Sequence, residues 1–172
     1  MASERALLVV DVLQGIFALP EPLHDPDGFI AVVQAMVARA RASGTPVVYL
    51  QHVGPPGTPF ARGTAAREID ARVKPAPGDL VVEKEHPDGF HGTKLAGLLA
   101  RARELAICGF ASEACVDTNV RSAYAHGYRV VLVADGHTTT CNAVLSAPQI
   151  IAHHNHVLAR FAEVLPHQRV NL

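Results

Sequence analysis

Apolar residues along the chain gather in short runs that alternate with stretches of helical periodicity. The runs are rich in Val, Leu and Ile without polar alternation, which is typical of strands buried on both faces of a sheet. They predict strands at residues 6–10, 46–51, 80–83, 105–108, 129–134 and 162–165. Apolar residues at helical spacing predict helices at residues 29–42, 94–103, 116–126 and 147–160.

This alternation predicts an α/β fold in which helices cover both faces of a parallel sheet. A length of 172 residues suits a single domain, residues 1–172, with no internal repeat or linker. The stretch GPPGTPFARGTAA, residues 54–66, is the one long loop that the pattern predicts. Long loops in compact domains are often functional, so this loop is a candidate part of a site.

Composition and charge narrow the classes of partner and the compartment. Hydrophobic residues make up 49% of the chain and the formal net charge is −1, which gives no reason to expect nucleic acid or a membrane as partner. No apolar run approaches the ~20 residues of a membrane span, and the start MASERALLVVDV lacks a signal-peptide layout. Three cysteines without CxxC spacing do not suggest a disulfide framework. We therefore expect a cytoplasmic protein.

Residues that directly follow the predicted strands are candidate site residues. Ligands in open parallel sheets bind beyond the carboxyl ends of the strands, where the strand order reverses. The residues at these ends are Asp11, His52, Lys84, the turn at 109–115, and Asp135 with His137. An acid, a lysine and a cysteine at three strand ends form a coherent chemical set.

Cys115 falls at the predicted start of a helix, directly after an apolar run. The helix dipole and Lys84 would lower the pKa of a thiol there, and Asp11 could accept its proton. Backbone N–H groups of the turn could stabilise an oxyanion, which completes the logic of an activated nucleophile. A structural cysteine is the alternative on spacing alone.

Three segments resemble the isochorismatase-like cysteine hydrolases over residues 6–161. They are LLVVDVLQGIF around Asp11, GDLVVEKEHPDGFHGTKL around Lys84, and ICGFASEACVDTNVRSAYAHGYRVVLVADGHTTT around Cys115. The resemblance implies a Rossmann-like three-layer αβα fold with a six-stranded parallel sheet. It implies a catalytic triad of Asp11, Lys84 and Cys115, a cis peptide between Phe110 and Ala111, and an oxyanion hole made by the amides of Ala111 and Cys115. It also implies a homo-oligomer, a dimer or tetramer, that hydrolyses a small amide, ureido or carbamoyl compound through a thioester.

The chain departs from the family pattern at two places. Family members often carry glutamine two residues after the aspartate, whereas this chain has Leu13 there and Gln14 next. Nicotinamidases carry an Asp-x-His metal motif after the second strand, where this chain reads VVYLQHVGPPG with His52 as the one candidate ligand. We therefore expect no metal and no cofactor, as in the metal-independent branch.

Other histidines, phenylalanines and cysteines receive weaker assignments. Candidate walls of the substrate pocket are Phe17, Phe60, Phe90, His91 and His137, although core packing is the default for a phenylalanine. His86 either borders the pocket or is an ordinary polar residue of the loop. The cluster of His153, His154 and His156 favours a structural or subunit-interface role over a metal site. Cys108 is expected to be inert, and Cys141 has no assigned role.

Three other classes stay open. Isochorismatases proper, which hydrolyse a vinyl ether, lack the nucleophilic cysteine, so Cys115 counts against that reaction. A non-catalytic interaction protein of the same fold has no need of the intact set of acid, lysine and cysteine. A flavodoxin-like or dinucleotide-binding protein is disfavoured because no GxGxxG follows the first strand.

Overall fold

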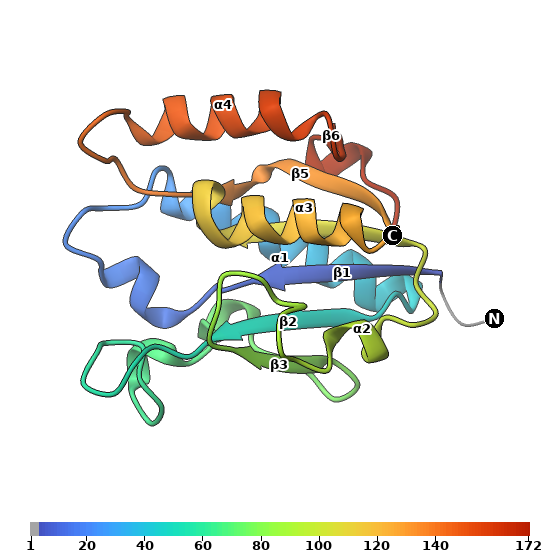
Figure 1. Cartoon of the computed structure of the whole chain (residues 1–172), viewed down its shortest axis with the longest axis horizontal. Coiled ribbons are helices and arrows are strands. Elements are labelled where there is room, and N and C mark those ends of the chain that lie inside the picture. Colours follow the sequence, from blue (N-terminus) through green and yellow to red (C-terminus); the bar gives the residue numbers. More distant parts are fainter. Residues whose placement is uncertain (1–3) are drawn as a thin grey trace.

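The computed structural model describes residues 4–172 and contains one parallel sheet of six strands (Figure 1). The strand order is β3-β2-β1-β4-β5-β6, and every neighbouring pair is parallel. The strands are β1 (Arg5–Val10), β2 (Val47–His52), β3 (Leu80–Lys84), β4 (Glu104–Phe110), β5 (Arg129–Thr138) and β6 (Glu163–Leu165). Residues 1–3 of the predicted single domain lie outside the described residues.

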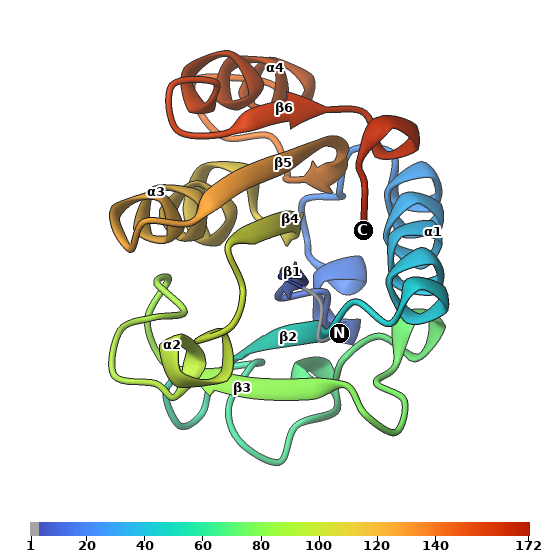
Figure 2. The same cartoon turned by 90° about the vertical axis from the view of Figure 1, so that its right-hand side faces the viewer.

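Helices cover both faces of this sheet, which confirms the predicted three-layer αβα fold. Figure 2 shows α1 (Pro26–Ser43) on one face, and α2 (Leu95–Leu98), α3 (Asp117–Ala125) and α4 (Ala147–Leu158) on the other. Shorter turns of helix are η1 (Gln14–Ala18), η2 (Ala65–Arg67), η3 (Ala71–Val73), η4 (Ser112–Val116) and η5 (His167–Arg169). No helix of the described chain is long and apolar enough to cross a membrane.

Strand β1 explains why the predicted strands lack polar alternation. Leu7 and Val9 pack in the core on the α1 side, whereas Ala6, Leu8 and Val10 pack in the core on the α3 side. All five are at most 1% exposed, because successive side chains of a strand point to opposite faces and helices cover both.

Helix α1 is set by its terminal residues. Asp25 precedes it with a φ of 43°, and its carboxylate accepts a hydrogen bond of 3.2 Å from the N–H of Gly28. Pro26 then occupies the first turn, where its missing N–H costs nothing. Gly44 ends the helix in a left-handed conformation, as its position in the sequence predicts.

Two elements differ from their predicted extent by more than three residues at one end. The helix predicted at 94–103 is a single turn, α2, because Gly97 weakens it and the chain must turn at 99–103 to enter β4. Strand β5 runs four residues beyond the predicted end at 134, through Asp135 and His137 to Thr138. The pairing with β4 shifts register between Ile107 and Gly109, and this irregularity lets the pairing continue past the apolar run.

The strand order places the reversal point between β1 and β4. After β1 the chain builds β2 and β3 to one side, then returns to place β4, β5 and β6 on the other. Ligands bind at such a point in doubly wound sheets. Asp11 follows β1, and the turn that contains Cys115 follows β4, so both lie at this point.

Candidate active site

The structure brings the side chains of Asp11, Lys84 and Cys115 together at the carboxyl edge of the sheet. Nζ of Lys84 lies 2.7 Å from Oδ2 of Asp11 and 3.3 Å from Sγ of Cys115. The lysine is 2% exposed and the aspartate 4%, so this ion pair is almost fully removed from water. A buried charge pair beside a thiol is a set of groups able to move a proton.

Asp11 holds an uncommon backbone conformation. Its φ is 50°, in the left-handed region that residues other than glycine seldom adopt, although aspartate tolerates it better than most. Strained residues of this kind concentrate at functional sites, where the surrounding structure holds them. Lys84 is the ion-pair partner of the Asp11 carboxylate, which also interacts with the Cys115 thiol.

Cys115 lies in the π-helical turn η4, between β4 and α3. The Phe110–Ala111 peptide bond that precedes this turn is cis, as the resemblance implies. Gly109 lies directly before it with a φ of 135°, and a Cβ there would stand 2.0 Å from the carbonyl oxygen of Val10. Glycine at 109 therefore allows β4 to approach the end of β1 and brings the cysteine to Asp11.

The expected lowering of the Cys115 pKa is wrong. Burial and the neighbouring Asp11 carboxylate raise the pKa of the thiol to about 12, and Lys84 opposes this only in part. The cysteine also lies within η4 rather than at the first residue of α3, which begins at Asp117. The resting thiol is therefore protonated at neutral pH, with a carboxylate beside it.

Asn119 braces the site, and sequence reasoning missed it. Its amide nitrogen donates to the carbonyl oxygens of Cys115 (2.7 Å) and Pro87 (2.9 Å), and its amide oxygen accepts from the N–H of Gly89 (2.8 Å). The side chain is fully buried and ties the loop after Lys84 to the turn of the cysteine. The signal available in the sequence is a polar residue four positions after Cys115, one helical turn along the inward face.

A second buried network holds the same turn from the other side. Asn155 of α4 donates to the carbonyl of Ala134 (3.0 Å), so its amide oxygen accepts from Nε2–H of His137 (3.0 Å). Nδ1 of His137 is then the acceptor for the hydroxyl of Ser112, at 2.7 Å. Burial lowers the pKa of His137, which keeps the ring neutral and this chain of donors intact.

A cavity of about 110 Å³ opens beside the cysteine, and its walls are mostly apolar. Of the predicted pocket residues, Phe60 lines it. The cavity is also lined by Ile16, Phe110 and Ala114, which sequence reasoning did not assign to the pocket. Leu13 takes the place where the family often has glutamine. Gln14 is exposed and does not line the cavity. The remaining lining residues are Asp11, His52, Ala111 and Cys115.

Phe60 comes from the long loop that the sequence predicts at 54–66. The loop folds back on itself: Gly54 N–H donates to the carbonyl of Phe60 (2.9 Å), and the Thr58 hydroxyl donates to the carbonyl of Pro55 (2.7 Å). The Thr64 hydroxyl lies 2.7 Å from the carbonyl of Pro59. These internal bonds present Phe60 to the cavity.

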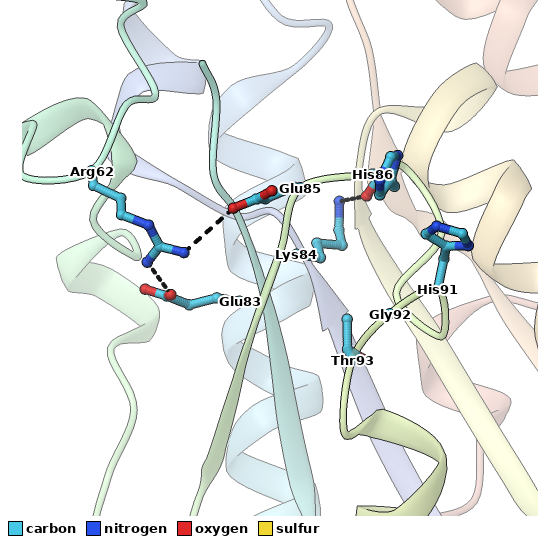
Figure 3. A pocket seen from close by; sticks show the side chains of 8 residues that line it. All are labelled: Arg62, Glu83, Lys84, Glu85, His86, His91, Gly92 and Thr93. Carbon is cyan, nitrogen blue, oxygen red and sulfur yellow. Dashed lines mark hydrogen bonds and ion pairs between the residues drawn. The ribbon is translucent and has the colours of Figure 1, made fainter. Parts of the chain in front are cut away.

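The other predicted pocket residues lie elsewhere. Phe17 packs against Phe29 under the guanidinium of Arg72, and Phe90 is buried against His126 and Tyr128. His137 belongs to the buried network described above. His91 lines a separate cavity of about 380 Å³ beyond Lys84, with His86, as Figure 3 shows.

Metal binding finds no support in the histidines. The described chain contains no group of three or more His, Cys, Asp or Glu side chains placed to hold a metal ion. His153 and His154 contact each other edge to face on α4, away from the cavity. His52 lines the cavity, where its buried Nδ1 has no hydrogen-bond partner among residues 4–172, and burial and Lys84 lower its pKa.

The chain is similar in sequence to several known hydrolases. Over 137 residues the chain is 42% identical to a streptothricin hydrolase of Streptomyces noursei. The matched region covers 78% of this chain and 54% of that protein. The chain thus spans about half the length of the streptothricin hydrolases it matches. It is 32% identical to the ureidoacrylate amidohydrolase RutB of Variovorax paradoxus, over 78% of this chain and 68% of that one.

The fold comparison points the same way. The crystal structure of an isochorismatase from Pseudomonas putida KT2440 superimposes with a TM-score of 0.93 and 31% identity, over 98% of this chain and 90% of that one. The family model described as the isochorismatase domain matches residues 5–168. The resemblance seen in the sequence is thereby confirmed, and the chain belongs to the isochorismatase family.

Proposed function

We propose that the protein is a cysteine-dependent amidohydrolase that acts on a small amide, ureido or carbamoyl compound. One observation carries the proposal: Lys84 Nζ lies within 3.3 Å of both Asp11 and the Cys115 sulfur, beside a cavity. The relatives support it, since one of them is named as an amidohydrolase and another as a hydrolase.

Chemistry begins with transfer of the thiol proton to Asp11. Because the thiol pKa is about 12, the proton leaves only as the sulfur attacks the carbonyl carbon, and the carboxylate accepts it. Lys84 remains positively charged and stabilises the negative charge that shifts from the carboxylate to the sulfur and the carbonyl oxygen. A C–S bond forms and the carbonyl oxygen becomes an oxyanion.

The backbone N–H groups of Ala111 and Cys115 are assigned to this oxyanion. When the tetrahedral intermediate collapses, the C–N bond breaks and Asp11 returns its proton to the leaving ammonia or amine. Water then attacks the thioester, or the thiocarbamate of a ureido or carbamoyl substrate, and gives a proton to Asp11. The C–S bond breaks, Asp11 returns that proton to the sulfur, and the carboxylic or carbamic acid leaves. No step requires a metal or a cofactor.

A screen of small primary amides, ureas and carbamoyl compounds for ammonia release tests the proposal. Cys115→Ala is expected to abolish release while the circular dichroism spectrum stays unchanged. Cys141→Ala, at an exposed cysteine, is the matched control and is expected to keep wild-type rates. Wild-type turnover by Cys115→Ala would overturn the assignment of the nucleophile.

Two further properties belong to the same proposal. Cys108, Cys115 and Cys141 are all free thiols, which fits the reducing cytoplasm. Assembly into a dimer or tetramer stays a prediction, which light scattering at micromolar concentration would contradict by finding monomer alone.

A further inference from the structure

The cavity beside Cys115 has few groups with which to recognise a charged substrate. Its walls are the side chains of Leu13, Ile16, Phe60, Phe110 and Ala114. Apart from the reacting pair of Asp11 and Cys115, the one polar side chain that lines it is that of His52. The group next to the scissile carbonyl would therefore lie against carbon atoms.

Within the described chain, the cations near this cavity each have an anionic partner. Lys84 is paired with Asp11, and Arg67 with Glu83. Arg62 contacts both Glu83 and Glu85 at the rim of the neighbouring cavity, as Figure 3 shows. A substrate carboxylate placed among the apolar walls would lose its hydration without gaining a cation, which is costly.

His52 offers the remaining hydrogen-bonding group. It ends β2 directly beside Lys84 in the β2–β3 pairing, and its buried Nδ1 has no partner within the described chain. Burial and the neighbouring Lys84 cation lower the pKa of His52, so the ring is neutral and able to bond an uncharged polar group.

Cavity size limits the substituent. A cavity of roughly 150 Å³ holds benzene, so one of about 110 Å³ holds on the order of four or five non-hydrogen atoms. We propose that the substrate is an uncharged amide whose short apolar acyl group occupies the wall formed by Leu13, Ile16, Phe60, Phe110 and Ala114, with His52 hydrogen-bonded to its carboxamide. This inference rests on the proposed amidohydrolase function and adds the class of substrate.

A pair of amides of equal shape tests the charge requirement. In 3-methylbutanamide an isopropyl group stands where malonamate has a carboxylate, and both release ammonia on hydrolysis. The wild-type kcat/KM is expected to be at least about 100-fold higher for 3-methylbutanamide. Equal rates, or a preference for malonamate, would overturn this inference and leave the amidohydrolase function standing.

A variant and its control locate the effect in the cavity wall. Phe60 is half-buried, so Phe60→Arg places a cation at the wall without forcing it into the core, and it is expected to shift the preference toward malonamate by at least about tenfold. Leu98→Arg, at an exposed position of α2, adds the same charge outside the cavity and is expected to change nothing. An equal shift in both variants would overturn the assignment of the wall.

The role of His52 has its own readout. His52→Leu is expected to raise KM for 3-methylbutanamide about tenfold with a smaller change in kcat, and His52→Asn, which retains hydrogen-bonding groups, is expected to restore part of the loss. An unchanged KM in His52→Leu would overturn that contact.

A binding measurement separates failure of the inference from failure of the function. Calorimetry with Cys115→Ala detects 3-methylbutanamide in the cavity without turnover. Binding of this amide but not malonamate, with no hydrolysis by the wild type, would overturn the proposed function and keep the substrate class. Preferential binding of malonamate would overturn the substrate class itself.

Discussion

The hydroxyl of Ser112 donates a hydrogen bond of 2.7 Å to Nδ1 of His137, and both residues are at most 3% exposed. Ser112 lies three residues before Cys115 in η4, whereas His137 lies in β5. A proton on Nδ1 would remove the acceptor and leave the serine hydroxyl without its partner. The placement of the turn that contains Cys115 therefore depends on His137 remaining neutral.

The stability of the protein is expected to fall in mild acid because of His137. Burial lowers its pKa from the ordinary value of 6.5, so the unfolded chain binds a proton before the folded chain does. This contribution is complete above pH 6.5 and is lost as the pH falls further. Urea unfolding at pH 7 and 5.5 is expected to show a loss about 1 kcal/mol larger in the wild type than in His137→Gln. His156→Gln, at an exposed histidine of α4, serves as control, and an equal loss in all three proteins would contradict a neutral His137.

Thiol labelling is expected to rank the three cysteines by burial and charge. With iodoacetamide at pH 7.5, the exposed Cys141 reacts first, because burial and Asp11 keep the pKa of Cys115 at about 12. Burial also raises the pKa of Cys108 to about 12, and this residue is expected to react only after unfolding. Mass spectrometry of peptides taken over time measures the order. Faster labelling of Cys115 than of Cys141 would show that Lys84 outweighs burial.

Removal of the buried lysine is expected to damage both activity and stability. In Lys84→Met the Asp11 carboxylate loses its countercharge in a buried site, so the protonated acid is favoured and no base remains. We expect kcat/KM to fall at least about 100-fold and the free energy of unfolding to fall by about 3 kcal/mol. The double variant Asp11→Asn/Lys84→Met is expected to regain stability without activity. Lys74→Met, at an exposed lysine, is the control; equal stability of Lys84→Met and the wild type would argue against a buried charge pair.

Loss of the Asn119 side chain is expected to destabilise the loop after Lys84 and the turn that contains Cys115. Asn119→Ala leaves the N–H of Gly89 and the carbonyl oxygens of Cys115 and Pro87 without this partner. Denaturant unfolding is expected to show a loss of about 2–4 kcal/mol. Asn142→Ala, which removes a side chain from an exposed turn, is expected to cost less, and similar losses in both would mean that the brace contributes little.

Strand placement was predictable because the central strands of the sheet are apolar on both faces. Leu7 and Leu8 point to different layers, yet both are buried, so the run stands out from the polar residues around it. The end of β5 was not predictable, since Asp135 and Gly136 read as a turn and lie in the irregularity between Leu132 and His137, where the register with β4 shifts. The shortness of α2 was not predictable, because a leucine-rich stretch has helical periodicity whether or not the chain turns after it.

The positions of Asp11, Lys84 and Cys115 at strand ends were predictable, but the charge state of the cysteine was not. Spacing reveals a nearby helix and lysine, whereas the opposing effects of burial and of Asp11 depend on coordinates. The pocket walls illustrate the same limit. Phe90 and Phe60 both occur in loop sequences, but Phe90 stacks on His126 within the core and Phe60 faces the cavity. The bracing role of Asn119 was not predictable either, because it depends on the loop after Lys84 lying beside this residue.

The loop at 54–66 is built separately from the groups that are proposed to react. Its hydrogen bonds from Gly54 to Phe60 and from Thr58 to Pro55 close within the loop, while the acid, lysine and cysteine sit on the sheet and the turn after β4. Exchange of this segment between related proteins would alter one wall of the cavity as a unit and leave the proton-transfer groups in place. Substitutions within this one loop can thus change the wall that a substrate contacts. Residues 54–64 are therefore the segment to randomise when a new amide is to be accepted.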